Sequence, residues 1–377
     1  MVLFVSNSSL VKVAVVGGGV IGVSTASQLA RAGADVILLT ESELTSGASG
    51  RSLSWLNAAG MWREPYHRLR MAGIDRYRTL SAQQPGLPWL RFSGGLAWHA
   101  DDKAEELRRR HEHEVRHGYQ SHLLARNEVG THIPGVNAAA IPDAGAIWNP
   151  GEGWVDLPSL AQFLIKDFLG RGGHLVTNAG ACTVRTNGGS VAGVVTGGGE
   201  FFGVDAAVLA TGATVPQMLA DLDITIADAT TIALLVTSRP VHHPLRAVLN
   251  TPRVSVRPTP DGGLAINSDW TAAHITRGAD GRHQVPEAII EALLAEASLV
   301  LYGRPELETA WYGIGPKPIP GDGEPVLGRV DHVGGLYVAF THSGATLGLI
   351  AGELLAYEII TGVAHPMLVD FNLRRFG

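Results

Sequence analysis

A glycine pattern near the start of the chain has the residue types and spacing of a phosphate-binding turn. Residues 17–22 read Gly-Gly-Gly-Val-Ile-Gly, directly after the β-branched run at 11–16. In a Gly-x-Gly-x-x-Gly turn the first glycine permits the tight bend, the second admits a pyrophosphate, and the third lets the following helix pack closely. Gly17, Gly19 and Gly22 occupy these positions and predict a dinucleotide-binding site.

The element that must position these glycines is a strand–helix–strand unit. Helical spacing runs through residues 23–31, so the amides of Val20 and Ile21 lie at a helix N-terminus and face the phosphates with the positive end of the dipole. Gly33 ends the helix, and residues 34–39 form a second buried strand. A glycine-rich turn without a ligand is the alternative, and the complete unit favours the dinucleotide site.

The end of the second strand departs from the usual pattern. An acidic residue normally stands about 20 residues beyond the glycines and holds a ribose hydroxyl. Thr40 occupies that position, and Glu41 follows it. Either the Thr40 hydroxyl replaces the carboxylate or Glu41 reaches the ribose, and we favour Glu41.

The rest of the chain predicts an α/β fold with a Rossmann-like, discontinuous nucleotide domain that carries an inserted, mainly antiparallel sheet domain. The nucleotide domain is expected at 1–88, 153–221 and 322–377, and the substrate domain at 89–152 and 222–321. Helices are predicted at 66–80, 101–117, 157–169, 286–301 and 346–361. Strands are predicted at 174–176, 181–186, 191–196, 201–204, 205–210, 232–237, 253–257, 264–267, 307–312 and 336–340, with a hairpin edge at 92–98.

Composition narrows the class of protein. A chain of 377 residues can form two domains, and a formal net charge of -6 argues against nucleic acid as its principal partner. Cys182 is the only cysteine, which excludes an internal disulfide and a cysteine-ligated metal cluster. Residues 1–10 lack signal-peptide features, and no apolar run reaches the roughly 18 residues of a membrane span. We expect a soluble, cytoplasmic protein.

Further motifs follow in a fixed order. They are Gly-Ala-Ser-Gly-Arg at 47–51, Gly-Glu-Gly-Trp-Val-Asp at 151–156, Leu-Ala-Thr-Gly at 209–212, Pro-Ile-Pro-Gly-Asp-Gly at 318–323 with Gly328, and Thr-His-Ser-Gly-Ala-Thr-Leu at 341–347. Together with residues 17–22, this series resembles the D-amino-acid oxidase-like family of FAD-dependent amine oxidoreductases, which includes glycine oxidase and monomeric sarcosine oxidase. The resemblance covers about residues 11–362.

The resemblance implies FAD as the cofactor, and the residues agree, because a single dinucleotide pattern leaves no second site for a nicotinamide. It implies that the helix starting near 346 faces flavin N1 and C2=O; ordinary helix packing is the alternative for Gly344 and Gly348. The cofactor-binding residues expected are Gly17, Gly19, Val20, Ile21, Gly22, Thr40, Glu41, Ser49, Gly50, Arg51, Ser52, Thr211, Gly212, Gly344, Ala345 and Thr346. Arg51 is assigned to the phosphate region.

The flavin is expected to be held without a covalent bond. Family members that attach FAD use a cysteine in the C-terminal third, or a histidine in a Trp-His-Ala-Ala-Gly-like segment. Cys182 lies in a central strand, and the second segment reads Trp-Leu-Asn-Ala-Ala-Gly at 55–60, without histidine. The attachment residues are therefore missing.

The residue that holds a substrate carboxylate departs from the family pattern. Glycine oxidase and D-amino-acid oxidase use an arginine in a Gly-Leu-Arg-Pro segment. Counted from one side that position is Gly315, and counted from the other it is Lys317. Lysine pairs with a carboxylate without the bidentate fork of arginine, and a solvated lysine in a proline-rich loop is the alternative. Arg63 and Arg257 are the other candidate cations.

Two lysines of monomeric sarcosine oxidase are also missing. Ala265 stands where the family places an oxygen-activating lysine, and Thr346 stands where it places a carboxylate-binding lysine. These replacements make sarcosine-type chemistry doubtful. They leave the electron acceptor open between oxygen and another molecule.

Several histidines are candidates for chemistry. His342 precedes the glycines expected to face the flavin and is assigned to flavin or substrate; a structural strand-end histidine is the alternative. His67 lies on a helix expected to flank the pocket, and packing is its alternative role. His113 and His117 are four residues apart among many charges, which predicts a solvated helix face rather than a metal site. No metal is expected.

These residues predict FAD-dependent oxidation of a C–N bond in a small amino acid or amine. Hydride passes to flavin N5, and the imine product is hydrolysed. The alternatives are a quinone-linked or biosynthetic tailoring dehydrogenase, or the FAD-holding subunit of a heteromeric amino-acid dehydrogenase. The expected partners are a small amine or amino acid and an electron acceptor; a homo-oligomer is compatible with the sequence.

Overall fold

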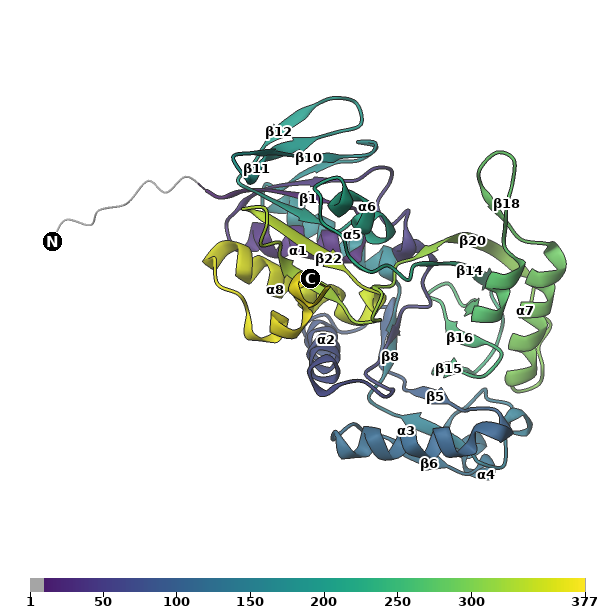
Figure 1. The fold of residues 1–377 in the computed structure, drawn as a ribbon. Helices are drawn as coiled ribbons and strands as arrows, with labels where there is room; N and C mark the ends of the chain where they lie inside the picture. The colour runs from purple at the N-terminus through teal and green to yellow at the C-terminus, as the bar shows by residue number, and fades with distance from the viewer. Residues whose placement is uncertain (1–9, 377) are drawn as a thin grey trace.

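A six-stranded sheet combines strands from both ends of the chain (Figure 1). The computed structural model describes residues 10–376. The expectation that residues 1–10 lack signal-peptide features therefore concerns, apart from residue 10, residues outside the described part of the chain. The strand order is β21-β22-β13-β1-β2-β9, with bounds β1 Lys12–Val16, β2 Asp35–Leu39, β9 His174–Val176, β13 Ala206–Leu209, β21 Val326–Arg329 and β22 Leu336–Phe340. Neighbouring strands are parallel except β21, an unpredicted strand that runs antiparallel to β22.

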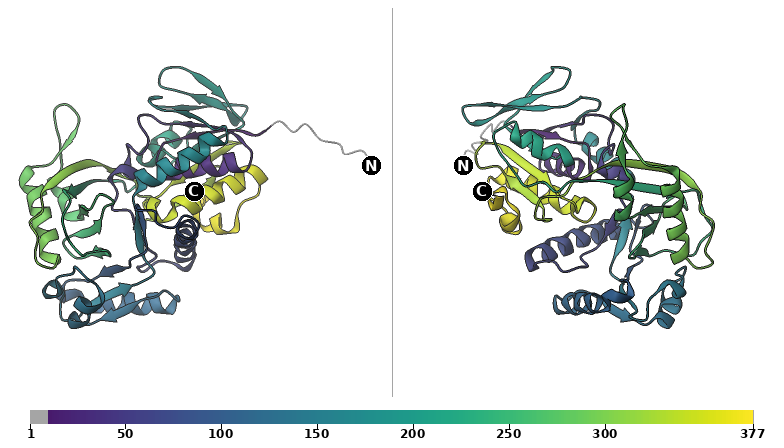
Figure 2. Two further views of the ribbon diagram at one scale, coloured as in Figure 1. Left: turned by 180° about the vertical axis from the view of Figure 1, so that it is seen from behind. Right: turned by 45° about the vertical axis from the view of Figure 1, so that its right-hand side comes forward.

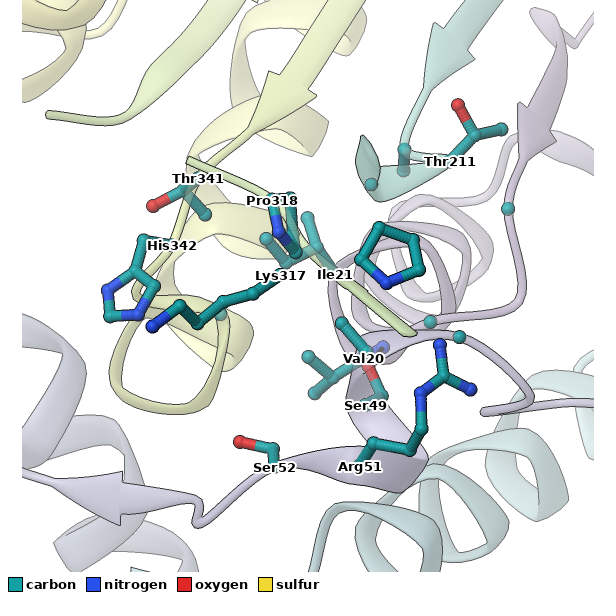
Figure 3. Close-up of a pocket in the computed structure, with 18 of the residues that line it drawn as sticks. Val20, Ile21, Ser49, Arg51, Ser52, Thr211, Lys317, Pro318, Thr341 and His342 are labelled. Carbon is teal, nitrogen blue, oxygen red and sulfur yellow. Dashed lines mark hydrogen bonds between the residues drawn. The ribbon is translucent and has the colours of Figure 1, made fainter. Parts of the chain in front are cut away.

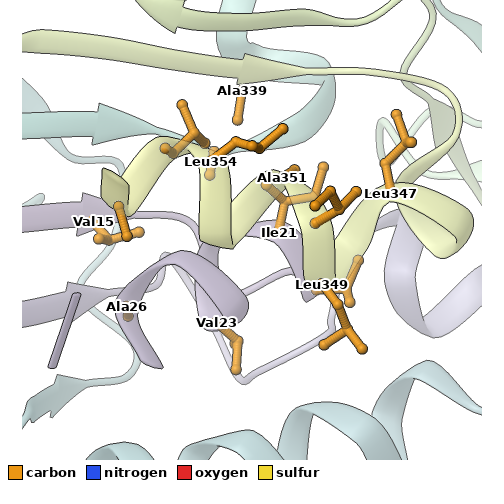
Figure 4. Packing of buried hydrophobic residues seen from close by; sticks show 14 of the residues in the cluster. Val15, Ile21, Val23, Ala26, Ala339, Leu347, Leu349, Ala351 and Leu354 are labelled. Atoms are coloured by element: carbon orange, nitrogen blue, oxygen red, sulfur yellow. The ribbon is translucent and has the colours of Figure 1, made fainter. Parts of the chain in front are cut away.

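Five helices in the described part of the chain pack around this sheet. They are α1 Val20–Arg31, α2 Glu64–Gln83, α5 Leu157–Gly170, α6 Val215–Ala220 and α8 Gly344–Thr361. Leu347 and Ala351 of α8 belong to the same buried cluster as Ile21 and Val23 of α1 (Figure 4). Gly352 permits this close approach, because a Cβ there would lie 2.6 Å from the carbonyl carbon of Ser24.

The most apolar helix of the fold is α8. Among the described residues, α8 is the one helix long and apolar enough to cross a membrane by length and composition, although Glu353 and Glu358 interrupt its apolar sequence. Inside the protein, 67% of it is buried. Because α8 packs against both α1 and α2, apolar residues occur around its whole circumference.

A second, eight-stranded sheet comes from the middle of the chain. Its order is β20-β14-β17-β16-β15-β5-β7-β6, with bounds β5 Gly95–Ala97, β6 His122–Leu124, β7 Ala146–Asn149, β14 Thr231–Ser238, β15 Val248–Asn250, β16 Ser255–Pro258, β17 Leu264–Asn267 and β20 Thr309–Lys317. All pairs are antiparallel except β15 with β5, which confirms the mainly antiparallel character. Figure 2 shows α7 Glu287–Val300 along one side of this sheet and α3 Ala104–Arg116 near its far end. α4 Arg126–His132 completes the helices.

Two local predictions for this sheet are wrong. Residues 92–98 are not a hairpin edge, because β5 is fully buried between β15 and β7. The strand predicted at 307–312 is too short, because β20 continues to Lys317 and pairs with β14 along its length, which also excludes the alternative of Lys317 in a loop. Both errors have one cause: the pairing partners lie far away in sequence, and local composition does not show them.

Small sheets complete the described fold. The three-stranded sheets are β10-β11-β12 (Thr183–Asn187, Ser190–Val195, Phe201–Gly203) and β3-β8-β4 (Trp55–Leu56, Gly153–Val155, Leu90–Arg91), and β18 Thr276–Arg277 pairs with β19 His283–Gln284. β3-β8-β4 joins segments on both sides of the expected boundary at residue 88. Leu90 is buried in the same cluster as β1 and α1, so contacts cross that boundary.

Candidate functional site

A cavity of about 750 Å³ lies at the carboxyl ends of β1, β2 and β13 and is closed on its other side by β14 and β20 of the second sheet. The carboxyl edge of a parallel sheet is where ligands bind in open α/β folds. Residues from both sheets and from the start of α8 line it. All the residues expected to bind the cofactor line it except Gly22 and Gly50, which are absent from its wall.

The glycine turn has the shape that a pyrophosphate requires. Gly17 has φ +120°, and a Cβ on Gly17 or on Gly22 would collide with backbone of the neighbouring turn. Gly19 is different, because a Cβ there would meet only Ser49 Oγ, at 3.3 Å. The amide of Val20, the first residue of α1, donates to Ser49 Oγ at 3.0 Å. Gly19 is the N-cap residue of α1 and has no side chain to cap the helix. The space in front of this helix N-terminus therefore fits a phosphate group.

Thr40 and Glu41 both line the cavity, but the Thr40 side chain is buried and the Glu41 side chain is exposed. Thr40 is 4% exposed and packs against Gly18, where a Cβ would lie 2.6 Å from its hydroxyl oxygen. Glu41 is exposed. Of the two, Glu41 has the mobile side chain that can turn toward a ribose, and its role remains a prediction.

Arg51 extends over the strand that closes the cavity. It ends the 3-10 helix Ala48–Arg51 and donates to the carbonyl of Ser46. Its guanidinium lies over Gly315, and burial lowers its pKa from the ordinary arginine value. In the described part of the chain Arg51 makes no ion pair with a carboxylate, so its charge is free to meet an anionic ligand.

Lys317 and His342 meet at the other end of the cavity. Figure 3 shows Lys317 extending from the end of β20 toward the His342 ring. Lys317 Nζ also lies 2.9 Å from Asp269 Oδ1. Burial, followed by the charges of Lys317 and Arg70, lowers the pKa of His342 to about 4. His342 is therefore neutral near pH 7 and can exchange hydrogen bonds but does not act as a cation.

The structure does not bring His67 and Arg257 to the cavity wall, contrary to the expectation from sequence. His67 is 5% exposed and lies with Nδ1 3.2 Å from the carbonyl oxygen of Ala58, because α2 turns it toward α3. Arg257 is 3% exposed and donates to the carbonyl of Leu53, behind the wall. Arg63 is exposed and pairs with Glu324. Of the cations that the sequence singled out, Lys317 and Arg51 line the cavity.

Sequence reasoning missed a row of polar side chains on the second sheet. Asn250 pairs with Ser255 and Ser255 with Asn267 on neighbouring strands, and all three line the cavity. They also line a smaller hollow of about 180 Å³ beside it, with Trp270. Polar residues at the ends of apolar strands are a weak signal, and only the register shows that they share one face.

A buried carboxylate supports the cavity wall from behind. Glu152 is 0% exposed and accepts hydrogen bonds from Trp55 Nε1 at 2.7 Å and Tyr119 Oη at 2.6 Å. Burial raises the pKa of Glu152 to about 8. Since Trp55 lines the cavity, the hydrogen bond to Glu152 helps to fix one residue of the cavity wall.

The fold and this cavity define a protein that binds one dinucleotide between a Rossmann-type sheet and a mainly antiparallel sheet. The sequence matches the FAD dependent oxidoreductase (DAO) family over residues 12–358, and the chain belongs to this family. FAD is therefore its cofactor, and the glycine turn and the two helix N-termini fit it.

Individual proteins similar to this chain are amino acid oxidases and deaminases by name. The glycine oxidase of Geobacillus kaustophilus (strain HTA426) is 27% identical over 378 residues, covering 96% of each chain. The crystal structure of glycine oxidase from Geobacillus kaustophilus superposes with a TM-score of 0.81 at 23% identity, covering 96% of this chain and 98% of that one. L-Amino acid deaminase from Proteus myxofaciens in complex with anthranilate has a TM-score of 0.81 at 18% identity, covering 98% and 94%. At these identities the solved structures show the fold.

Proposed function

We propose that this protein oxidises the C–N bond of a small amino acid or amine. The observation that carries the proposal is the arrangement of the cavity: one end is a phosphate-binding turn, and the other brings Lys317, His342 and the polar row on β15–β17 together. The family supplies the cofactor, and relatives named as a glycine oxidase and an L-amino acid deaminase supply the substrate class.

Residues at one end of the cavity bind the cofactor, and residues at the other end bind the substrate. The turn at residues 17–22 and Ser49 hold the phosphates, and Glu41 or Thr40 holds the adenosine ribose. Bound FAD supplies a hydride acceptor. Lys317 pairs with a substrate carboxylate, which competes with Asp269 for its ammonium group. His342, neutral because its pKa is about 4, orients the amine by a hydrogen bond.

The reaction needs orientation more than a strong base. The substrate carbon loses a hydrogen with its electron pair, and its nitrogen loses a proton, so that an imine forms. Water then adds to the imine and releases ammonia or an amine. Holding the carboxylate and the amine at two fixed points aligns that C–H bond, which is a large part of the rate enhancement available to such a site.

The test is anaerobic bleaching of the FAD absorbance by a panel of D-amino, L-amino and N-methyl amino acids. Bleaching by one of these classes with formation of the matching keto or aldehyde product supports the proposal. A flavin that none of them reduces, but that is reduced by a different class of donor, overturns it.

A dehydrogenase is the second candidate, and one observation favours it. Ala265, on β17, stands where the family resemblance places an oxygen-activating lysine, and its small side chain is buried. Reoxidation of reduced enzyme by oxygen and by a quinone analogue distinguishes the two. A rate with the quinone at least a hundredfold above that with air-saturated buffer identifies the dehydrogenase.

A further inference from the structure

Arg70 is a buried cation without a buried anion. It lies on α2, is 4% exposed, and lines the cavity. No carboxylate in the described part of the chain pairs with it. The charged and titratable side chains that it influences are those of His342 and His67, neither of which supplies a negative charge. Burying a charge in this way is unfavourable unless a ligand balances it.

Neutral groups hold the Arg70 guanidinium in one orientation. Nε donates to the carbonyl of Asn57 at 3.1 Å, and Nη2 donates to Asn57 Oδ1 at 2.6 Å. Nη1 donates to Ser343 Oγ and to Tyr66 Oη. The Trp62 ring lies 4.9 Å from Cζ. The charge is therefore fixed in place, although none of these neutral groups neutralises it.

The position of Arg70 along the cavity identifies its counter-charge. The adenosine ribose would lie at the end of β2 and the pyrophosphate at the glycine turn, so an extended FAD would place its isoalloxazine toward the far end of the cavity. That end contains Ser343, which precedes α8 and accepts from Arg70. The N-terminus of α8, which is the positive end of its helix dipole, also lies at this end of the cavity. Two positive features, Arg70 and the N-terminus of α8, therefore meet at Ser343, at the end of the cavity that would hold the isoalloxazine.

We propose that Arg70 balances the negative charge that FAD gains when it is reduced. A hydride brings one proton and two electrons, so the reduced cofactor carries one more negative charge than the oxidised one. Arg70 stabilises the reduced form because its guanidinium is held in a buried position, where a fixed charge acts more strongly than in water. The proposal rests on reduction of FAD in the proposed function and is independent of which amine supplies the hydride.

The test compares holoenzymes carrying Arg70→Gln, Arg70→Lys and Arg76→Gln. Arg70→Gln removes the charge and keeps a donor for Asn57, whereas Arg70→Lys keeps the charge. Arg76 is the matched control: it lies on the same helix and contacts α8, but it is paired with Glu353 outside the cavity. The readouts are the FAD midpoint potential and the Kd of sulfite, which adds to oxidised flavin and leaves it negatively charged. Neither requires a substrate.

Arg70→Gln should weaken sulfite binding at least tenfold and lower the midpoint potential by about 30 mV, the equivalent of a tenfold change for a two-electron couple. The Kd of sulfite for Arg70→Lys should lie within threefold of the wild-type value. Arg76→Gln should have the wild-type Kd and the wild-type midpoint potential. Equal potentials in all variants that retain FAD overturn the proposal. So does a selective loss of acetate binding in Arg70→Gln at unchanged potential, which assigns the charge to a substrate carboxylate. Failure of every amine to bleach the flavin overturns the proposed function alone.

Discussion

The guanidinium of Arg51 lies directly over Gly315, in the space that a side chain on that residue of β20 would fill. Gly315 is one of the two positions at which the family resemblance places a carboxylate-binding arginine. The chain therefore has a cation at this place, but the cation belongs to the 3-10 helix Ala48–Arg51, which follows β2. Its half-buried neighbours Ser49 and Ser52 face the cofactor cavity (Figure 3).

Gly315→Ala should displace Arg51 while preserving the fold, because the new Cβ meets only the flexible end of the arginine side chain. If Arg51 holds the phosphates, loss of its charge-assisted hydrogen bond costs about 1.5–3 kcal/mol. The Kd of FAD should then rise roughly ten- to a hundredfold, as in Arg51→Gln. Isothermal titration of the apo-protein measures it. Unchanged FAD affinity in both variants removes Arg51 from the phosphate site.

Lys317→Ala should raise KM for a carboxylate substrate roughly ten- to a hundredfold more than for the corresponding amide or decarboxylated amine. The physical reason is loss of a partly buried cation that faces the cavity. Asp269→Asn is the matched control, because it frees Lys317 from its ion pair and should lower KM for the acid. Equal effects of Lys317→Ala on acid and amine would exclude it from substrate binding.

Gly19→Val should give folded protein without FAD. Gly19 has φ −77°, which valine can adopt, and its Cβ position faces the cavity near Ser49. The added methyl groups would occupy the path of the pyrophosphate. Absorbance at 450 nm and circular dichroism separate loss of flavin from loss of fold. Normal FAD content in this variant would mean that the cofactor lies elsewhere.

Release of FAD from wild-type protein should be complete on acid or heat precipitation. Cys182 does not lie in a central strand, as the sequence predicted, but directly before β10, an edge strand of a three-stranded sheet. It is buried, with Sγ near the carbonyl of Gly180, and the segment at 55–60 contains no histidine. We therefore expect yellow FAD in the supernatant, identified by chromatography. Flavin that stays with the pellet would demonstrate a covalent bond, and Cys182, which lines the cavity, would be the first residue to replace.

Glu152 should make the folded state less stable as the pH rises. Its pKa is raised from 4.5 to about 8, so between these values the folded protein binds a proton that the unfolded chain releases. The free energy of unfolding should fall by up to about 1.4 kcal/mol per pH unit in that window and level off above it. Urea unfolding at pH 5.5, 7 and 8.5 measures the slope, and Glu152→Gln should flatten it.

Glu114→Gln is the control for this prediction. Glu114 is also buried, and burial by itself would raise its pKa, but the Arg110 guanidinium beside it holds that pKa below the usual range. Its replacement should lower stability by a similar amount at all three pH values. A wild-type slope in Glu152→Gln would show that Glu152 is ionised in the folded protein.

Local sequence predicted the strand–helix–strand unit and the long helices well. β1, α1 and β2 lie within 30 residues of one another, and the glycines, apolar runs and helix stops that form them are adjacent in the chain. Each expected helix is present and differs only at its ends: α2 is Glu64–Gln83 where 66–80 was expected, and α7 is Glu287–Val300 where 286–301 was expected. The short helices α4 and α6 were not predicted.

The sequence by itself determined the dinucleotide turn, because its glycines and flanking apolar runs are near neighbours, and it determined the family through the order of short motifs along the chain. Tertiary structure alone decided which polar side chains meet in the cavity. Arg70 reaches Ser343 across 273 residues and Trp55 reaches Glu152 across 97, and β5 is central because it pairs with strands that lie far away in the sequence. Such contacts follow from how helices and sheets pack together, which residue type and local period do not specify.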